Sequence, residues 1–306
     1  MADVPVAAAE VDLPVRRPFA ATALLQFFAA HTVPGVEQVC GRTYFRSLRL
    51  PGGPATVALT LPADDGTEQV HGVFRASTGD DLAMAVRAAG KLLDLDADSA
   101  VIDTSLAADP ALATGVQAMP GLRVPGAVDG PETLIRTMLG QQVSVAGAQT
   151  AASRLVRAVD DRLPEPDGPL SHLFPTPGAI AELGPSAIVG PRRRAHAVCG
   201  AAAAMADGSL AVHSGRVPRE LTTELVAQPG IGPWTAGYVA MRLLPDTDVL
   251  LVGDLVLRRG AALLGLPDTP GALAAHSAAW RPFRSYAGMH LWRTALAQRG
   301  RLDSRL

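Results

Sequence analysis

The sequence predicts an α+β protein, in which an antiparallel sheet with flanking helices is followed by a longer part made of helices. Two observations support this. Before residue 103, apolar and polar residues alternate in short runs, which is the pattern of half-buried strands. After residue 103, apolar residues recur with helical spacing, and the pattern gives no convincing strand.

The strands of the first part are predicted at residues 44–50, 56–61 and 70–76. Pro-Gly-Gly-Pro at 51–54 predicts a hairpin turn after the first of them. Apolar helical patterns flank the strands near residues 21–30 and 80–93. The segment before Phe19 contains several prolines, and we interpret it as a loose lead.

The chain after residue 103 is predicted to form a series of helices with short connections. Asp129 followed by Glu132 resembles a capping box, and apolar residues continue with helical spacing to Leu139. Proline and glycine predict breaks between helices. These breaks fall at residues 164–169, 175–178, 190–191, 229–233 and 266–271.

Composition excludes several classes of protein. The formal charge of −2 gives no global electrostatic case for binding nucleic acid. No apolar run reaches the ~20 residues that span a bilayer, and the first residues lack the pattern of a signal peptide. Cys40 and Cys199 are too few for a disulfide framework or an iron–sulfur cluster. We expect a cytoplasmic protein.

The most informative segment is residues 221–244, LTTELVAQPGIGPWTAGYVAMRLL. Pro233 suits the first turn of a helix, and Gly230 and Gly232 let the backbone approach another molecule closely. The unpaired N–H groups at the helix start, together with the Thr235 hydroxyl, suit a phosphate. The same pattern also fits an ordinary structural turn or a non-catalytic DNA-binding module.

With Trp234 and Asp254 added, the segment resembles the helix–hairpin–helix DNA glycosylase superfamily, and the closer match is to 3-methyladenine DNA glycosylase II of the AlkA type. Several separate motifs in one order are more specific than the hairpin alone. They are TYFRSLRL (43–50), PGLRVPGAVD (120–129), LGQQVSVAGA (139–148), FPTPGAIAEL (174–183), PGIGPWTAGYVAMR (229–242) and WRPFRSYAGMHLW (280–292).

This resemblance implies an antiparallel α+β domain at 1–103, a helical domain at 128–244 with the helix–hairpin–helix at 219–244, and a second helical domain from 104–127 plus 245–306. The active cleft lies between the two helical domains. It also implies roles for individual residues. These are Asp254 as the catalytic carboxylate, Trp234, Tyr238, Trp292 and Phe27 as base-pocket aromatics, Gly230, Gly232, Thr235 and Gln142 as DNA-binding residues, and the carbonyls of Val226, Gln228 and Ile231 as ligands of a structural cation.

Two positions depart from relatives. Leu255 stands where AlkA-type relatives can carry a pocket tyrosine. Gln142 stands where some relatives place a leucine that wedges into the duplex, which suggests that a polar side chain fills the gap left by the flipped base.

The chemistry of base release agrees with these residues. Cleavage builds positive charge on the sugar, which a fixed carboxylate such as Asp254 can stabilise. Taken alone, Asp254 also fits an ordinary helix cap, and Trp234 and Tyr238 fit core packing. Relatives that nick the backbone carry a lysine at position 234, and the only lysine here is Lys91. A lyase mechanism is therefore not expected.

We thus expect a monofunctional, monomeric N-glycosylase that excises alkylated bases from double-stranded DNA without an organic cofactor. Two alternatives stay open. One is a related glycosylase for oxidised or deaminated bases, and the other is a lesion-binding protein without catalysis. Similar segments can be fused to alkylation-sensor domains.

Overall fold

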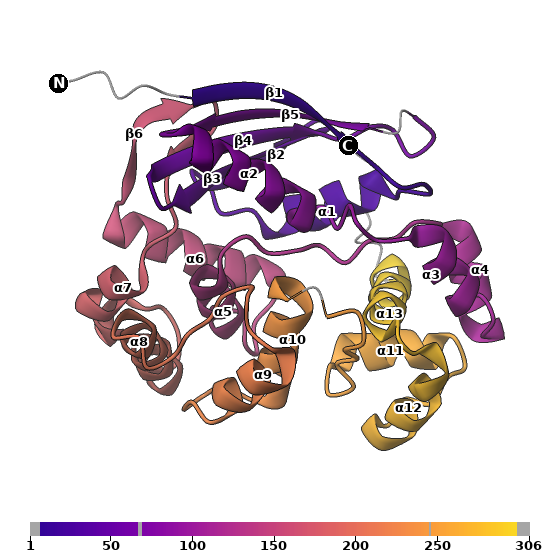
Figure 1. Cartoon of the computed structure of the whole chain (residues 1–306). Coiled ribbons are helices and arrows are strands. Elements are labelled where there is room, and N and C mark those ends of the chain that lie inside the picture. Colours follow the sequence, from indigo (N-terminus) through magenta and orange to yellow (C-terminus); the bar gives the residue numbers. More distant parts are fainter. Residues whose placement is uncertain (1–6, 67–68, 245, 299–306) are drawn as a thin grey trace.

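The computed structural model describes residues 7–66, 69–244 and 246–298. Its N-terminal part is an antiparallel five-stranded sheet of order β1-β5-β4-β3-β2, at the top of Figure 1 with helices below it. The predicted sheet, its hairpin turn and its two helices are confirmed. The elements are β1 (Ala7–Pro14), α1 (Ala21–His31), β2 (Glu37–Cys40), β3 (Thr43–Leu50), β4 (Gly53–Thr60), β5 (Gln69–Ala76) and α2 (Gly79–Leu92).

Strand β1 corrects the expected loose lead. It pairs with β5 along its whole length, from Ala7 opposite Ala76 to Pro14 opposite Gln69. Because β1 is an edge strand, the missing N–H of Pro14 removes no bond from the sheet interior. The interpretation of this segment as loose is wrong for residues 7–14, and residues 1–6 lie outside the described residues.

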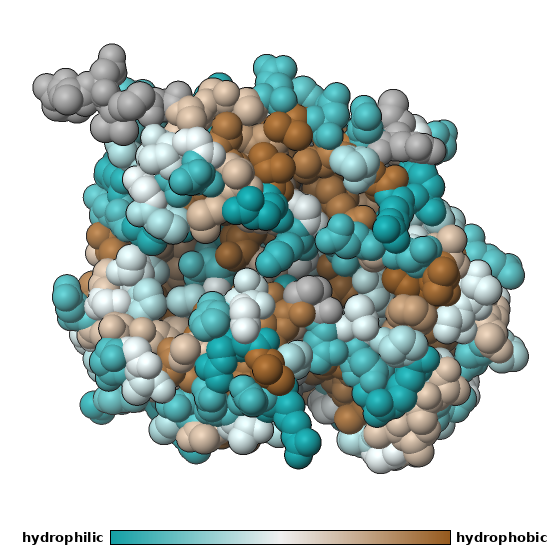
Figure 2. All heavy atoms as spheres, in the orientation of Figure 1, coloured by the Kyte–Doolittle hydropathy of each residue, from teal (hydrophilic) through white to brown (hydrophobic). Residues whose placement is uncertain are grey.

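The second part is mainly helical, and Figure 1 shows its helices in two groups, α5–α10 and α3–α4 with α11–α13. In Figure 2 the surface is hollowed between these groups at the bottom of the view. Among the residues that the structure describes, no helix has both the length and the apolar character of a membrane span. The elements are α3 (Ser99–Leu106), α4 (Pro110–Ala118), α5 (Gly130–Leu139), α6 (Val145–Val159), β6 (Arg162–Asp167), β7 (Leu170–His172), α7 (Pro177–Leu183), η1 (Pro185–Ala187), α8 (Arg192–Ala206), α9 (Pro218–Val226), α10 (Pro233–Leu243), α11 (Leu255–Leu263), α12 (Pro270–His276), η2 (Ser277–Trp280) and α13 (Arg284–Gln298).

A short irregular hairpin, β6–β7, interrupts the helices where the sequence predicted only a break. Its buried leucines pack with Phe45 of the main sheet. Asp167 at its tip accepts hydrogen bonds from Arg75 of β5 at 2.9 and 2.8 Å. The expectation of helices alone after residue 103 is therefore wrong here, because contacts with the main sheet stabilise a strand pair that contains two prolines.

Three large clusters of buried apolar side chains form the core. One fills the space between the sheet, α1 and α2. The second lies among helices α5–α10 and also takes in Val33 and Val36. The third joins α3, α4 and α11–α13, and includes Ala20, Ala23 and Met241 from the other parts. The apolar clusters thus combine residues from both sides of the predicted domain boundaries near 103, 127 and 244. The division into three domains stays a prediction.

Helix α5 begins with half of the predicted capping box. Asp129 accepts a hydrogen bond from the backbone N–H of Glu132 at 2.7 Å. The Glu132 carboxylate does not return to the cap, because it pairs with Arg46 of β3 at 2.5 Å and with Arg136 one helical turn later at 2.7 Å. The side chain that would complete the box instead ties α5 to the sheet.

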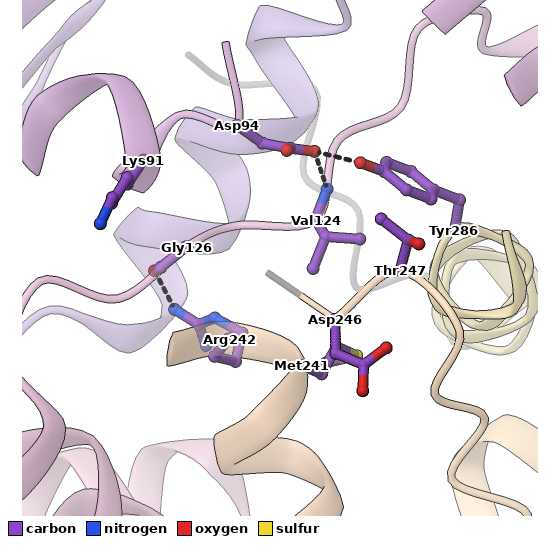
Figure 3. Close-up of a pocket in the computed structure, with 9 residues that line it drawn as sticks. All are labelled: Lys91, Asp94, Val124, Gly126, Met241, Arg242, Asp246, Thr247 and Tyr286. Carbon is purple, nitrogen blue, oxygen red and sulfur yellow. Dashed lines mark hydrogen bonds between the residues drawn. The ribbon is translucent and has the colours of Figure 1, made fainter. Parts of the chain in front are cut away.

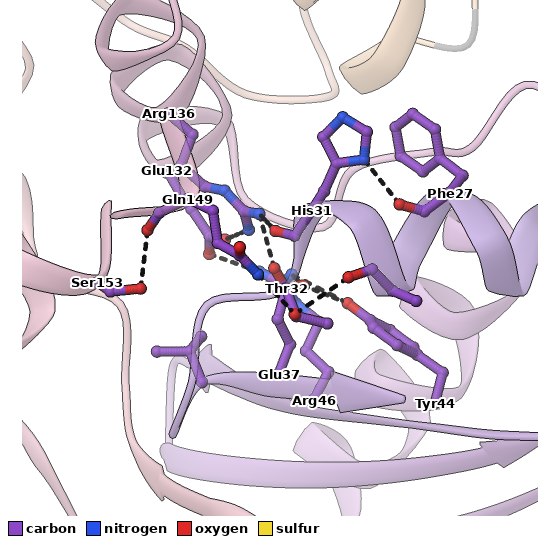
Figure 4. A network of polar contacts seen from close by, with 12 residues as sticks. Phe27, His31, Thr32, Glu37, Tyr44, Arg46, Glu132, Arg136, Gln149 and Ser153 are labelled. Atoms are coloured by element: carbon purple, nitrogen blue, oxygen red, sulfur yellow. Dashed lines mark hydrogen bonds and ion pairs between the residues drawn. The ribbon is translucent and has the colours of Figure 1, made fainter. Parts of the chain in front are cut away.

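These contacts belong to a buried ionic network between the sheet and α5 (Figure 4). Glu37 of β2 lies 2.8 Å from Arg46 and 2.6 Å from Arg136, and it accepts a hydrogen bond from the Tyr44 hydroxyl at 2.5 Å. Burial alone would raise the pKa of Glu37, but the guanidinium groups of Arg136 and Arg46 lower it to about 2. With Glu132, the network holds two carboxylates and two guanidinium groups, so its charges balance.

Candidate active site

Asp254 lies immediately before α11 and caps that helix. One oxygen of its carboxylate, Oδ1, accepts a hydrogen bond from the backbone N–H of Leu257 at 2.8 Å. This geometry is the usual role of aspartate at a helix start, so the cap interpretation is correct. The cap also fixes the direction of the carboxylate, which is half-buried.

Two indole rings bind the same carboxylate. Trp234 of α10 donates from Nε1 to Oδ2 at 2.9 Å, and Trp292 of α13 donates from Nε1 to Oδ1 at 3.2 Å. Asp254 therefore connects the first turns of α10 and α11 with the middle of α13. All three donors are neutral, and a carboxylate offers about four lone-pair positions, so about one remains for a further donor.

The predicted aromatic residues form one wall beside Asp254. Trp234 and Tyr238 stack with ring centroids 5.3 Å apart at 10°, and Trp292 meets Tyr238 edge-on at 6.5 Å. The rings of Trp234 and Tyr238 are therefore nearly parallel. Phe27 of α1 joins the wall through Arg242, whose guanidinium carbon lies 4.8 Å from the Phe27 centroid and 5.4 Å from that of Tyr238.

The two glycines of the hairpin differ in backbone conformation and in the space around them. Gly230 has φ +80°, and a Cβ there would lie 2.6 Å from Cβ of Ala197 in α8, so both the turn and the packing require glycine. Gly232 has φ −97°, and a Cβ there would meet nothing within 4 Å. The interior of the protein therefore does not require glycine at 232.

Thr235 lies where the sequence placed it, in the first turn of α10, but it is only 2% exposed. Its hydroxyl accepts a hydrogen bond from Nε2 of Gln141 at 3.0 Å, and the same nitrogen donates to the carbonyl of Gly230 at 2.9 Å. In this arrangement the hydroxyl supports the hairpin and does not face solvent.

Gln142 and Leu255 are exposed. Gln142 has φ +56°, a left-handed conformation, and it follows directly on the hairpin-bound Gln141. The hydrogen bonds of Gln141 thereby hold the candidate wedge residue next to the hairpin. Leu255 follows Asp254 and is 74% exposed, so it protrudes instead of covering the carboxylate.

The carbonyls proposed for a structural cation lie around the hairpin turn. The Gln228 carbonyl already accepts a hydrogen bond from the N–H of Ile231 at 3.2 Å. Val226, which ends α9, is 45% exposed. The turn brings all three carbonyl-bearing residues within one short segment.

Sequence reasoning missed two residues of the site. Gln141 stands beside the predicted Gln142, and its side chain reaches the hairpin 89 positions later along the chain. Arg242 follows Trp234 and Tyr238 at the same spacing of four residues, which places all three on one helix face. That spacing was a usable signal for Arg242, whereas nothing local identifies the partners of Gln141.

The comparisons agree with this architecture. Residues 10–129 match the model of the AlkA N-terminal domain. The chain is 34% identical over 275 residues to DNA-3-methyladenine glycosylase 2 of Escherichia coli, covering 89% of this chain and 92% of that protein. It is 43% identical over 282 residues to the probable bifunctional transcriptional activator/DNA repair enzyme AlkA of Mycobacterium tuberculosis.

That alignment covers 92% of this chain but 56% of the mycobacterial protein, so the chain spans about half the length of that relative. Among solved structures, a 3-methyladenine DNA glycosylase from Archaeoglobus fulgidus has the same fold, with a TM-score of 0.80 over 93% of this chain and 98% of that one at 20% identity. On the strength of the sequence match to the Escherichia coli enzyme, the chain belongs to the AlkA family of DNA-3-methyladenine glycosylases.

Proposed function

We propose that this protein excises alkylated bases from double-stranded DNA by flipping the base out of the duplex and hydrolysing its bond to the sugar with the help of Asp254. The observation that carries the proposal is the Asp254 carboxylate, held by two indole N–H groups and one backbone N–H beside an aromatic wall. Relatives whose names denote 3-methyladenine glycosylases support the choice of alkylated bases.

The carboxylate suits the transition state of base release. As the bond between base and sugar breaks, positive charge develops on the sugar, and a negative group fixed nearby stabilises it. The three donors to Asp254 carry no charge, so they orient the carboxylate without cancelling its charge. Its remaining acceptor position can orient the attacking water and take its proton.

The wall of Trp234, Tyr238, Trp292 and Phe27 suits the flipped base. Extrusion of a nucleotide from the stack costs a few kcal/mol, and stacking on aromatic side chains returns about 1–3 kcal/mol per base. An alkylated purine that carries a positive charge gains further attraction to the ring faces. A base with weaker stacking or hydrogen bonding in the duplex flips more readily.

The hairpin would hold the DNA backbone during this step. Gly232, with open space around it, and the N–H groups at the start of α10 offer a phosphate site. We further propose that Gln142 fills the gap left by the flipped base. A monovalent cation held by the carbonyls of Val226, Gln228 and Ile231 would stabilise the turn. In this proposal, a monomer acts on cytoplasmic, nucleoid-associated DNA without an organic cofactor.

The proposal includes the absence of lyase activity. Position 234 is tryptophan, and Lys91 lies on α2, where it lines a recess with Met241 and Arg242. Without an amine at the exposed sugar carbon, no Schiff base forms, and the abasic site stays intact until alkali or heat breaks the strand.

The test is a base-release assay on duplex DNA containing a single 3-methyladenine analogue or 7-methylguanine, with strand breaks scored before and after alkali. The expected result is free base with breaks only after alkali, and no covalent protein–DNA adduct when borohydride is present. Binding to the lesion without base release would favour the lesion-binding alternative. Efficient trapping that disappears in Lys91→Ala would overturn the monofunctional mechanism, and trapping that persists would point to the terminal amine, which lies outside the described residues.

A further inference from the structure

Arg242 lies in the aromatic wall, and the family resemblance implies no base-pocket role for it. Its Nη1 donates a hydrogen bond to the Tyr238 hydroxyl at 2.6 Å. The guanidinium carbon lies 4.8 Å from the Phe27 ring centroid and 5.4 Å from that of Tyr238. Arg242 thus contacts two of the four aromatic residues proposed to receive the base.

The positive charge of Arg242 is not cancelled by direct contact with a carboxylate. Its other hydrogen-bond partners are the carbonyl oxygens of Pro125 and Gly126. Within residues 7–66, 69–244 and 246–298, the ion pairs that arginines form do not include Arg242. A guanidinium stays protonated in proteins, so the aromatic wall contains a permanent cation.

Arg242 also lines a recess of about 250 Å³, a volume that includes the part open to solvent (Figure 3). Asp246 and Asp94 are the acidic residues that line it. In Figure 3 the Asp246 carboxylate points away from the guanidinium. Asp94 is occupied by the Tyr286 hydroxyl at 2.9 Å and the N–H of Val124 at 3.2 Å, and burial raises its pKa to about 6. Neither carboxylate forms a contact that neutralises Arg242.

Arg242 also stabilises the end of α10. Arginine in the last turn of a helix interacts favourably with the helix dipole, and the bonds to Pro125 and Gly126 join α10 to the preceding connection. Arg123 shows what such a role looks like elsewhere in this chain. It donates to the backbone carbonyls of Asp94 and Ala97, and its guanidinium carbon lies 5.3 Å from the Phe19 ring centroid.

We propose that Arg242 determines which charge class of damaged base the pocket favours, raising the rate for neutral bases relative to cationic ones. This inference rests on the proposed function and concerns the same pocket. It assigns the selectivity to one permanent charge in the wall of Phe27 and Tyr238, and not to the shape of the pocket.

The reason lies in where the electron pair goes. In base release, the bond between sugar carbon C1′ and the base nitrogen breaks, and both electrons stay on the base. A neutral purine such as hypoxanthine then leaves as an anion, which later takes a proton from water. A cationic purine such as 7-methylguanine leaves as a neutral molecule, and the proton of the attacking water goes to solvent through Asp254. In both cases water adds its hydroxyl to C1′ and its remaining proton leaves through Asp254. With a neutral base, that released proton balances the one that the departing anion takes up.

A nearby positive charge acts oppositely on these two reactions. It stabilises the negative charge that develops on a neutral base as the base departs. It repels a base that already carries a positive charge and weakens the attraction of that base to the face of Tyr238. Arg242 therefore raises the ratio of the kcat/KM value for hypoxanthine to that for 7-methylguanine.

The experiment measures this ratio in the wild-type protein and in Arg242→Gln and Arg242→Lys. At an effective dielectric constant of about 20, two charges several ångströms apart interact strongly enough to change a rate by about tenfold, so we expect a fall of about tenfold in this ratio in Arg242→Gln. Arg242→Lys keeps the charge and should stay within about threefold of the wild type. Because both substrates are tested on one preparation, the ratio does not depend on the folded fraction.

Arg123→Gln is the matched control, since it removes another arginine that contacts carbonyls and an aromatic ring. Both kcat/KM values should fall together in this variant. An equal loss for both substrates in Arg242→Gln would overturn the proposal while leaving the glycosylase assignment intact. A wild-type protein that releases 7-methylguanine but no hypoxanthine would also overturn it. Release of neither base would instead refute the proposed function itself.

Discussion

Two polar clusters lie where the parts of this protein meet, and they handle charge in opposite ways. In the buried network, Glu37 and Glu132 are each within 2.8 Å of guanidinium groups, so every charge has an opposite neighbour. At the candidate active site, Asp254 receives three hydrogen bonds from neutral groups and no ion pair is formed with it among the described residues.

The difference indicates which cluster can act on another molecule. A balanced, buried network has already used its charges to join β2, β3 and α5, and it offers little field to a ligand. Asp254 and Arg242 keep their charges uncancelled on either side of the aromatic wall. Such preorganised charges act on whatever charge develops in a bound substrate, without reorganisation at the moment of reaction.

The largest effect is expected at Asp254. Asp254→Asn should reduce single-turnover base release by at least about 10²–10³-fold, as expected when a group that stabilises transition-state charge is removed. In either orientation of the asparagine amide, its NH₂ would face an indole donor, because Trp234 binds Oδ2 and Trp292 binds Oδ1. Lesion binding and the near-ultraviolet circular dichroism spectrum are therefore measured in parallel. Turnover at the wild-type rate in a folded Asn variant would exclude Asp254 as the catalytic carboxylate.

The network should show the reverse behaviour. Arg46→Met leaves Glu37 and Glu132 short of a partner, and breaking a buried pair in this way costs about 3–5 kcal/mol of unfolding free energy. Urea denaturation measures this loss, while the rate of base release per folded molecule should stay unchanged. The control is Arg75→Met, whose side chain is 49% exposed and pairs with Asp167, and it should cost no more than about 1 kcal/mol. Equal losses in both variants would contradict the distinction between the two regions.

A third test addresses the hairpin. Gly232→Asp fits the available space and puts a carboxylate where we place a DNA phosphate. Affinity should fall by about tenfold or more for damaged and undamaged duplexes alike, with a shallower salt dependence, because phosphate contacts carry no base specificity. Gly178→Asp in the first turn of α7 adds the same charge at another open position and serves as the control. Unchanged affinity in a folded Gly232→Asp variant would remove the hairpin from the DNA-binding surface.

The smallest effect concerns stability against pH. Burial lowers the pKa of His31 and of His290 to about 4, so the unfolded chain binds more protons than the folded one between pH 4 and 6.5. Stability should therefore increase as pH rises through this range. The raised pKa of Asp94, about 6, acts against this trend, since its folded form holds a proton that the unfolded form has lost. The ionic network contributes little here, because the pKa of Glu37 is about 2.

Burial also raises the pKa of Asp103 and of Asp129, which adds to the effect of Asp94. Because the pKa values of the two histidines are both lowered far, from 6.5 to about 4, we expect a net gain in the urea midpoint from pH 4.5 to 6.5. His290→Gln should flatten the curve, since it removes one of the two histidines. A midpoint that falls over this range in the wild-type protein would show that the histidines do not govern the slope.

The sequence predicted those parts of the site that depend on local spacing or on motifs. The turn at Gly230, the helix start at Pro233 and the shared face of Trp234 and Tyr238 all follow from residues a few positions apart. The cap at Asp254 was recognisable for the same reason. These features needed no knowledge of the rest of the chain.

Features that depend on long-range contacts were missed. The prolines before Phe19 argue against a central strand, so the sequence pattern does not predict β1. The structure tolerates Pro14 there because β1 is an edge strand. Strand β6 contains two prolines, a third lies in the turn before β7, and the hairpin contacts Phe45 and Arg75 of the main sheet. The partners of Arg242 at Pro125 and Gly126 lie more than a hundred residues away along the chain. Periodicity carries no information on such contacts.

The hydrogen bonds to Asp254 also place two fluorescent side chains at the candidate active site. The chain contains three tryptophans, and two of them, Trp234 and Trp292, donate their indole N–H to this carboxylate. The third, Trp280, is 1% exposed and donates to Asp109 at 2.7 Å. A base bound in the proposed pocket would change the surroundings of Trp234 and Trp292, whereas Trp280 keeps a different carboxylate as its partner. We therefore expect the intrinsic ultraviolet emission of the unlabelled protein to change when a flipped base binds and when it leaves.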